Sequence, residues 1–331
     1  MFYNYVFFDE SGSYFRIARS DLNDFPYCLI RESGFLPQAN IFKQFLFKAH
    51  TSRHFSKNNR AVPLQNIWNK NYIGKLNFPE NKPICFVFAT ALATYYDMKL
   101  FEYLRKNFPD CRLVLLLRDI VQVCLNRSGG RSINDLLSTF DQIYTINSND
   151  EEKYGFKKIN PMCSRYPVNV TSENVSDIVF IGRVKDRADT INQIYTRLTN
   201  AGVNCDFTLM VDKSEKNIAD GIKVIFRPIK YEEMLEKTVQ SKCVLEVTQK
   251  GISSVSARCM EALCYNKKLV TDIKSVKSMK YYNSKYMFVY DNPEEIDPDF
   301  IKENINVDYN YDDSFSPINL LKHIDDDLTA Q

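Results

Sequence analysis

Residues 177–187, DIVFIGRVKDR, decide the fold. Four apolar residues in succession predict a buried β-strand, and this strand ends at the isolated Gly182. A basic segment follows, and residues 188–201 then predict a helix that ends at Gly202. A buried strand, a loop and a helix in this order predict one unit of an α/β domain with a parallel sheet.

The same alternation continues to about residue 289. Further strands are predicted at 206–211, 223–226, 243–247, 268–271 and 286–289. Helices are predicted at 231–240 and 253–265. Together these elements predict a complete doubly wound domain.

The first half of the chain shows an earlier cycle of the same kind. Its strands are predicted at 3–8, 27–30, 84–89, 113–117 and 142–146, and its helices at 41–49 and about 97–107. Residues 147–176 are polar and contain two prolines, so they predict the connection between domains.

We therefore predict an α/β protein of two Rossmann-like domains that face each other across a cleft between their strand ends. The predicted boundaries are 1–165 for the N-terminal domain and 166–300 for the C-terminal domain. Residues 301–331 are predicted to be a helical tail that packs back toward the N-terminal domain, with its last helix opening at Pro317.

Charge differs between the two halves. Residues 1–170 carry 22 Lys and Arg against 15 Asp and Glu, whereas residues 171–331 carry 21 against 26. The basic half suggests an anionic partner, although solvated surface charge explains the pattern equally well. Nine scattered cysteines without a Cys-x-x-Cys pair predict buried thiols in a reducing compartment, and no signal peptide opens the chain. These features predict a cytoplasmic protein.

Several enzyme classes are disfavoured by missing motifs. The ten glycines form neither Gly-x-Gly-x-x-Gly nor Gly-x-x-x-x-Gly-Lys-Ser/Thr, which disfavours a dinucleotide-dependent oxidoreductase and a P-loop enzyme. The three histidines have no metal-ligand spacing, and the two Asp-x-Asp sequences at 297–299 and 325–327 lie in acidic segments. We therefore expect no metal and no cofactor.

The basic loop after the 177–181 strand is a candidate site for a diphosphate. Gly182 permits close approach of a ligand, and Arg183, Lys185 and Arg187 supply positive charge. The alternative is a basic surface loop that precedes a helix.

A second candidate lies in residues 245–263, where a buried strand leads through a Gly/Ser turn into a helix. Backbone N–H groups and the helix dipole favour an anion at such a helix start. The candidate binding residues here are Gln249, Gly251, Ser253, Ser254, Ser256, Arg258 and Glu261. The alternative is an ordinary capped helix with a surface ion pair.

Three segments in this order resemble the donor domain of GT-B glycosyltransferases, notably bacterial enzymes of lipopolysaccharide, capsule and other surface polysaccharides. The segments are a strand ending in Gly182-Arg183, the sequence YEEML at 231–235 followed by SKCVLEV at 241–247, and the sequence RCMEAL at 258–263 followed by KKLVT at 267–271. The resemblance covers about residues 175–275.

The resemblance implies a role for each matched residue. Gly182 and Arg183 would face the diphosphate of a nucleotide-sugar, which the resemblance implies to be UDP-linked, and residues 253–256 would hold phosphate. Tyr231 would lie near the base, and Glu261 would bind the ribose. Many retaining members carry a second glutamate at the position that Ser253 occupies here, so the stereochemical outcome stays open.

Two other functions remain open. One is a nucleotide-sugar epimerase on the same fold, which would turn over without an acceptor. The other is a non-catalytic sugar-nucleotide-binding subunit of a polysaccharide assembly.

A catalytic base for the acceptor hydroxyl is predicted at Asp9, which directly follows the first strand. Glu10, Asp97 and Asp119 are the alternatives. Asp9 also fits a turn or capping residue.

Residues Ile41–Arg60 alternate large apolar side chains with lysine and arginine, which is typical of a segment that lies on an anionic membrane. Peripheral attachment would suit a lipid-linked saccharide acceptor, and an amphipathic core helix is the alternative. The basic residues form no long tract, so no nucleic-acid partner is expected.

Overall fold

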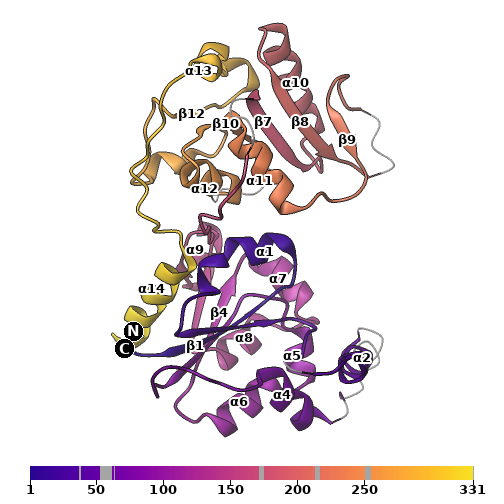
Figure 1. The fold of residues 1–331 in the computed structure, drawn as a ribbon, viewed down its shortest axis with the longest axis vertical. Coiled ribbons are helices and arrows are strands. Elements are labelled where there is room, and N and C mark those ends of the chain that lie inside the picture. The colour runs from indigo at the N-terminus through magenta and orange to yellow at the C-terminus, as the bar shows by residue number, and fades with distance from the viewer. Residues whose placement is uncertain are drawn as a thin grey trace. The chain divides into compact units, whose positions relative to one another are not determined.

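The computed structural model describes residues 1–36, 39–52, 62, 64–170, 175–212, 217–249 and 255–330. The chain divides into two compact units (Figure 1). Unit 1 comprises residues 1–159 and 317–331, and unit 2 comprises residues 160–316.

The described part of unit 1 contains a six-stranded parallel sheet in the order β2-β1-β3-β4-β5-β6. The strands are β1 (Asn4–Asp9), β2 (Cys28–Glu32), β3 (Ile84–Phe88), β4 (Arg112–Leu117), β5 (Gln142–Thr145) and β6 (Lys157–Lys158). The central strands are buried on both faces, which explains why they are near-continuous apolar runs in the sequence. The strand order reverses between β1 and β3, so the switch point of this sheet lies beside Asp9.

Helices cover this sheet, and the last of them contacts the N-terminal end of the chain. They are α1 (Ser13–Ala18), η1 (Ser20–Leu22), α2 (Ile41–His50), α4 (Gln65–Ile73), α5 (Ala93–Asp97), α6 (Leu100–Asn107), α7 (Val121–Arg127), α8 (Ile133–Thr139), α9 (Ser148–Tyr154) and α14 (Pro317–Thr329). The buried Asp325 of α14 accepts hydrogen bonds from the backbone N–H groups of Phe2 and Tyr3, so the two termini lie together (Figure 1).

The described part of unit 2 contains a second six-stranded parallel sheet in the order β12-β11-β10-β7-β8-β9. Its strands are β7 (Ser176–Arg183), β8 (Cys205–Met210), β9 (Lys223–Ile225), β10 (Ser241–Glu246), β11 (Lys268–Thr271) and β12 (Met287–Val289). Numbered along the unit, this is the 3-2-1-4-5-6 order of the Rossmann fold. The switch point lies between β7 and β10.

Unit 2 has its own helices and its own core. The helices are α10 (Ala188–Asn200), α11 (Tyr231–Val239), α12 (Ala257–Cys264), η2 (Lys274–Ser278), η3 (Pro293–Glu295) and α13 (Pro298–Lys302). Ile191, Ile194 and Leu198 of α10 pack on one face of the sheet, in the cluster that contains Phe180 and Leu245. The opposite cluster is built around α12.

The unit boundaries differ from the predicted positions. The division falls at 159/160 and 316/317, whereas the sequence suggested 165/166 and 300/301. Cys163, Tyr309 and Phe315 explain the difference, because they pack against α12 in the core of unit 2. The predicted connection at 147–176 is also partly ordered within unit 1, where Asn147 caps α9 and its side chain accepts a hydrogen bond from Asn149 N.

No helix of the described residues is long and apolar enough to span a membrane. All nine cysteines are free thiols, and seven of them are buried, as the sequence predicted. Among the described residues, no three His, Cys, Asp or Glu side chains gather in a group that would hold a metal ion.

Candidate functional site

The carboxyl ends of β7 and β10 define the candidate site in unit 2. These neighbouring strands lie where the strand order reverses, which is where open α/β sheets bind ligands. Gly182 and Arg183 close β7, and Glu246 closes β10. The sequence predicted the first two as site residues but did not single out Glu246, whose signal was a carboxylate at the end of a buried apolar strand.

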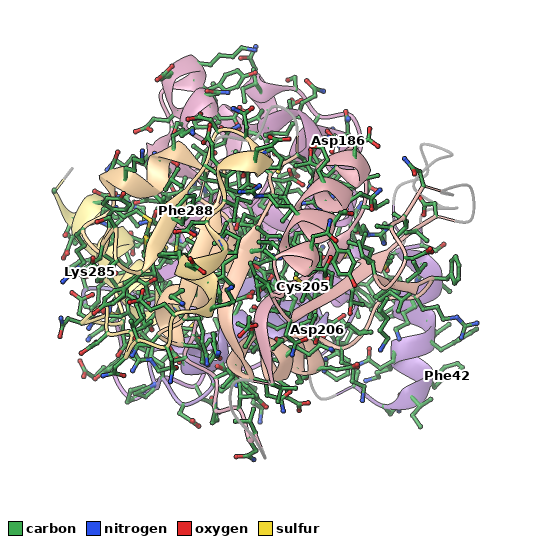
Figure 2. The ribbon with its side chains drawn as sticks, turned by 90° about the horizontal axis from the view of Figure 1, so that it is seen from above. Phe42, Asp186, Cys205, Asp206, Lys285 and Phe288 are labelled. Atoms are coloured by element: carbon green, nitrogen blue, oxygen red, sulfur yellow. The ribbon has the colours of Figure 1, made fainter. Side chains whose placement is uncertain are left out.

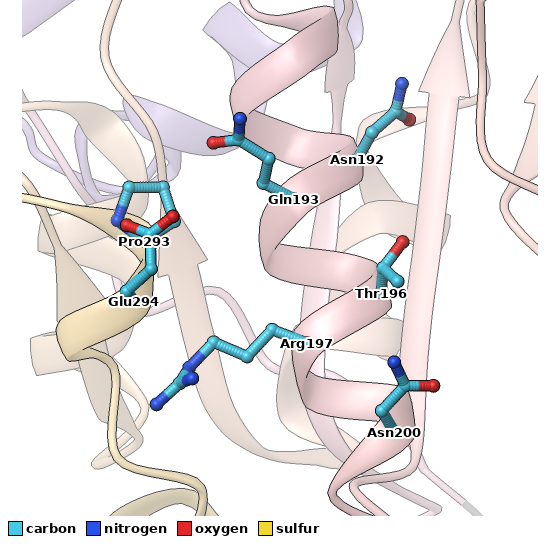
Figure 3. A pocket seen from close by; sticks show the side chains of 7 residues that line it. All are labelled: Asn192, Gln193, Thr196, Arg197, Asn200, Pro293 and Glu294. Atoms are coloured by element: carbon cyan, nitrogen blue, oxygen red, sulfur yellow. The ribbon is translucent and has the colours of Figure 1, made fainter.

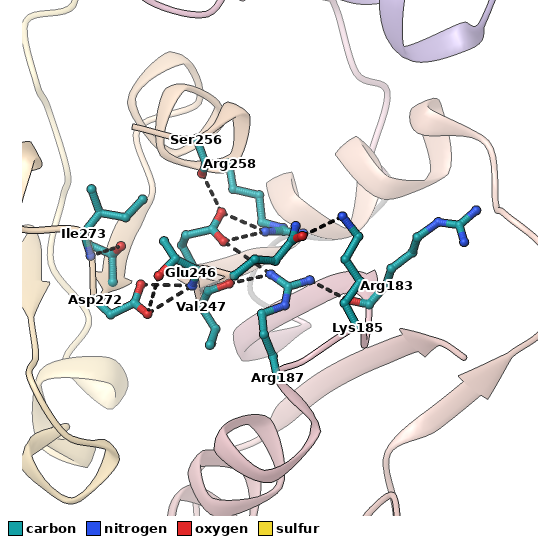
Figure 4. Close-up of polar contacts among 12 residues, drawn as sticks. Arg183, Lys185, Arg187, Glu246, Val247, Ser256, Arg258, Asp272 and Ile273 are labelled. Carbon is teal, nitrogen blue, oxygen red and sulfur yellow. Dashed lines mark hydrogen bonds and ion pairs between the residues drawn. The ribbon is translucent and has the colours of Figure 1, made fainter. Parts of the chain in front are cut away.

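Glu246 is buried and organises a network of charged side chains (Figure 4). Its two carboxylate oxygens accept hydrogen bonds of 2.8 and 2.7 Å from Arg258 Nη1, and Arg187 Nη1 lies 3.8 Å from Oε1. Ser256 donates its hydroxyl hydrogen to the same carboxylate. Both guanidinium groups also lie over the ring of Phe180, at 4.9 Å for Arg258 and 5.5 Å for Arg187. Glu246 therefore pairs with two cations, the buried Arg187 and the partly exposed Arg258, and its single negative charge offsets one of the two positive charges.

Gly182 has a reason within the protein to be glycine. A Cβ atom at this position would lie 2.6 Å from Arg258 Nη2, which is shorter than real contacts permit. Arg258 needs this space because its Nε and Nη2 donate hydrogen bonds of 3.2 and 2.9 Å to the carbonyl oxygen of Ile181. Gly182 was predicted to leave room for a ligand, and in the structure it leaves room for the guanidinium group of Arg258.

The three cations of the basic loop have different environments. Arg187 is buried, and it donates hydrogen bonds to the carbonyl oxygens of Val247 and Arg183. Arg183 and Lys185 are exposed, and among the described residues no carboxylate lies within 4.0 Å of either. Lys185 has a φ of +46° and its Nζ donates a 2.7 Å hydrogen bond to Gln249 Oε1. Two of the three predicted cations are accessible to an anion.

The start of α12 lies beside this network. Ser256 caps the helix, because its hydroxyl oxygen accepts a hydrogen bond of 3.3 Å from Cys259 N. The predicted phosphate-holding residues Gly251, Ser253 and Ser254 lie outside the described residues. The described part of the site therefore contributes Ser256 and the helix start.

Glu261 lies on the buried side of α12, with 4% of its surface exposed. Its Oε1 accepts a hydrogen bond from the hydroxyl of Tyr231, the first residue of α11. The second oxygen, Oε2, has no hydrogen-bond partner among the described residues. Burial raises the pKa of Glu261 from 4.5 to about 7, while the hydrogen bond from Tyr231 and the charge of Arg258 act in the opposite direction. The structure thus brings together two residues predicted to bind the nucleoside.

Asp9, the predicted base, is completely buried at the end of β1. Its Oδ1 accepts hydrogen bonds from Arg118 and, at 2.7 Å, from Glu10 N, and Arg19 Nη1 lies 3.1 Å from Oδ2. Burial raises the pKa of Asp9, while the guanidinium groups of Arg118 and Arg19 act in the opposite direction. Both oxygens are engaged inside unit 1.

The alternative bases are more accessible. Asp119 lies two residues beyond the end of β4, its side chain is partly exposed, and Arg127 Nη2 lies 3.6 Å from Oδ2. Asp97 is the last residue of helix α5, so it does not follow a strand as the prediction assumed, and its Oδ1 lies 3.9 Å from Arg131 Nη2. Glu10 is half-buried next to Asp9.

A polar groove of about 590 Å³ opens elsewhere in unit 2, between α10 and η3 (Figure 3). It is lined by Asn192, Gln193, Thr196, Arg197, Asn200, Pro293 and Glu294. None of the residues predicted from the sequence lines it, so it is separate from the candidate donor site.

Known proteins resemble this chain in structure but not in sequence. A scan against protein-family models gives no match, and no protein of curated function matches the sequence. The structure is similar to an alpha-glucosyltransferase solved in complex with UDP and a 13-mer DNA containing a HMU base, with a TM-score of 0.55, 13% identity and coverage of 90% of this chain and 89% of that chain. The same kind of enzyme, solved with UDP and a 13-mer DNA containing a central A:G mismatch, gives a TM-score of 0.51, 12% identity and coverage of 90% and 89%.

The chain has the GT-B glycosyltransferase fold. An UDP-forming alpha,alpha-trehalose-phosphate synthase from Burkholderia xenovorans is a more distant neighbour, with a TM-score of 0.44, 9% identity and coverage of 90% and 89%. Its similarity is too low to add to the argument. The α/β fold class predicted from the sequence is confirmed, since both units have the parallel sheets that a GT-B protein requires.

Proposed function

We propose that this GT-B protein is a glycosyltransferase that moves a sugar from a nucleotide-sugar donor, UDP-linked, to a saccharide acceptor. The observation that carries the proposal is the arrangement at the switch point of unit 2. Arg183 ends β7 and Lys185 follows it, both exposed, and Glu261 of α12 has a carboxylate oxygen without a hydrogen-bond partner among the described residues. A fold alone does not define an activity, so these side chains carry the argument.

Each of these residues has a defined task in the proposed donor complex. Arg183 and Lys185 bind the diphosphate, because a guanidinium and an ammonium group complement phosphate oxygens. The start of α12 at Ser256 adds N–H groups and the positive end of the helix dipole. Glu261 accepts hydrogen bonds from the ribose hydroxyls, and Tyr231 lies beside it near the base.

We propose that the reaction needs no metal ion, because these cations neutralise the leaving diphosphate. The acceptor is a saccharide of surface glycan, lipopolysaccharide or capsule synthesis. The similar alpha-glucosyltransferase was solved with DNA, but this chain carries 43 Lys and Arg against 41 Asp and Glu, which favours a saccharide over a nucleic acid. Asp119 has the accessibility that a base for the acceptor hydroxyl requires.

The central prediction concerns UDP binding. Wild-type protein should bind UDP in the presence of EDTA, and Glu261→Gln should weaken this binding about tenfold to a hundredfold. The reason is that a hydrogen bond to a charged group contributes about 1.5–3 kcal/mol. Isothermal titration calorimetry measures both affinities. Failure of UDP to bind without Mg²⁺ or Mn²⁺ would exclude the metal-independent mechanism, and unchanged affinity of the variant would remove Glu261 from the site.

Glu236→Gln is the matched control, because it makes the same change at an exposed position of α11.

A pH series of unfolding measurements tests the effect of Glu261 on folding stability, separately from its effect on UDP binding. The raised pKa means that the stabilising contribution of protonated Glu261 is complete below pH 4.5 and is lost as the pH rises through about 7. The stability of wild type relative to Glu261→Gln should therefore fall across this interval.

Peripheral membrane attachment through α2 is the second part of the proposal. Ile41 is 90% exposed, and Phe42 and Phe45 are each 67% exposed. Phe42 projects from the outer side of the helix (Figure 2). Lys43 and Lys48 are exposed on the same helix, whereas Phe47 alone is buried in the core. Residues 53–60 of the predicted membrane segment lie outside the described residues. Exposed aromatic and basic side chains together suit an anionic lipid surface.

The expected result is that Lys43→Glu/Lys48→Glu weakens binding to phosphatidylserine-containing vesicles by about tenfold or more. Each basic residue near such a surface contributes about 1 kcal/mol, and reversal adds repulsion. Co-sedimentation at moderate salt measures the effect. Lys106→Glu/Lys158→Glu is the control, since both lysines are exposed elsewhere on unit 1. Equal binding by the two double variants would assign α2 a different role.

A further inference from the structure

A pocket of about 340 Å³ lies in unit 1 at the carboxyl end of β2, beside α1. Arg16, Arg19, Arg31 and Glu32 supply its charged lining, together with Asn23 and Phe35. We refer to it as the arginine pocket. Its lining residues include three arginines and one carboxylate, and Arg19 has a second carboxylate partner, Asp9, behind the pocket, so one positive charge remains without a counter-ion.

Glu32 fixes two of the arginines in place. Its carboxylate accepts hydrogen bonds of 2.8 and 2.6 Å from Nε and Nη2 of Arg16, and a third of 2.6 Å from Nη2 of Arg19. Arg19 is itself buried, and its Nη1 also donates a hydrogen bond to Asp9 Oδ2. The guanidinium planes are therefore held before any ligand arrives, which lowers the entropic cost of binding.

Arg31 has no such carboxylate. Its side chain is buried, and its Nε, Nη1 and Nη2 donate hydrogen bonds to the carbonyl oxygens of Ile73 at 2.6 Å, Ile30 at 3.0 Å and Lys75 at 3.1 Å. No carboxylate oxygen of the described residues lies within 4.0 Å of it. A guanidinium has five N–H donors, so two remain.

A buried charge that lacks a counter-ion costs free energy. An anion bound in the arginine pocket would offset this cost at Arg31 and would also use the free edge of Arg16. The position is favourable as well, because the carboxyl ends of parallel strands are the edge at which α/β sheets bind ligands. The planar fork of arginine matches the paired oxygens of phosphate and carboxylate groups.

We propose that the arginine pocket binds an oxyanion, a phosphate or a carboxylate, that the acceptor saccharide carries. The word acceptor rests on the glycosyltransferase function proposed above, whereas the anion site itself rests only on unit 1. The acceptor class would then be phosphorylated or uronic-acid-containing sugars, and neutral sugars would bind poorly.

Calorimetry on the full chain at constant ionic strength tests the proposal with glucose 6-phosphate, glucuronate and glucose as probes. Saturating UDP is present in one series, so that the donor site cannot take the phosphate. We expect glucose 6-phosphate, glucuronate or both to bind, and glucose not to bind. Arg16→Gln should weaken the anionic sugars about tenfold, the loss of one charge-assisted hydrogen bond.

Arg127→Gln is the matched control. Its side chain is 57% exposed against 59% for Arg16, and it also pairs with a single carboxylate of unit 1. It should bind the probes as wild type does. Absence of binding by both anionic sugars, or equal affinity in Arg16→Gln and wild type, would overturn the anion site. If UDP fails to bind while the Arg16-dependent affinity persists, the proposed function fails and the anion site stands.

Discussion

Replacing Glu246 with alanine should lower the free energy of unfolding of unit 2 by about 3–5 kcal/mol, because it leaves the buried guanidinium of Arg187 and the largely buried one of Arg258 without their carboxylate. Among the described residues, the remaining contacts of Arg258 and Arg187 would be carbonyl oxygens and the ring of Phe180. Glu246→Gln should cost less, since the amide oxygen still accepts a hydrogen bond. Urea denaturation followed by circular dichroism measures both changes.

The control is a less buried ion pair in the same unit. Asp206 of β8 (labelled in Figure 2) pairs with Lys237, and its side chain is 32% exposed. Asp206→Ala should cost about 1 kcal/mol or less, as partly exposed pairs do. A loss in Glu246→Ala no larger than in Asp206→Ala would show that the network contributes little.

The same network has a consequence for donor binding. Arg187 donates to the carbonyl oxygen of Arg183, so it holds the backbone from which the exposed guanidinium of Arg183 projects. Glu246 acts through Arg187 and Ser256 and has no predicted contact with the nucleotide. We therefore expect Glu246→Gln to weaken UDP binding less than Glu261→Gln does, although it destabilises the unit.

The strands were predictable because each is a local signal. The apolar runs at 84–88 and 113–117 can only be covered on both faces, and residues 178–181 form a third such run within β7. β6 was missed because two lysines have no apolar pattern, and its pairing with β5 is set by α9. The short helices of unit 1 that lack a clear periodicity were missed for the same reason.

The roles of charged residues depended on distant partners. The sequence predicted Arg183, Lys185 and Arg187 as equivalent cations. Arg187, however, is buried and donates a hydrogen bond to the carbonyl oxygen of Val247, sixty positions away. Arg258 and Glu261 were both predicted as binding residues, but Arg258 pairs with Glu246 and Glu261 accepts a hydrogen bond from Tyr231. Asp9 was predicted to be an available carboxylate at a strand end, because its partner Arg118 is distant in the sequence and no local pattern indicates the contact.

Asp9→Asn should destabilise unit 1 by about 3–5 kcal/mol, the range for breaking a buried pair. The buried carboxylate bridges Arg118 and Arg19. Arg19 would keep its contact with Glu32, whereas Arg118 has no other carboxylate within 4.0 Å among the described residues. Trp68, the sole tryptophan of the sequence, is buried in α4 of unit 1, so its fluorescence follows this unit during urea denaturation.

Asp119→Asn is the variant to compare with it, because Asp119 follows β4 of the same sheet and is partly exposed. It should change the stability of unit 1 by less than about 1 kcal/mol. Transfer measured with a UDP-sugar then assigns the base. A base at Asp119 predicts that Asp119→Asn loses transfer while it retains both stability and UDP affinity. Wild-type stability in Asp9→Asn, combined with lost transfer, would instead make Asp9 the base and contradict the structural role argued from its two arginines.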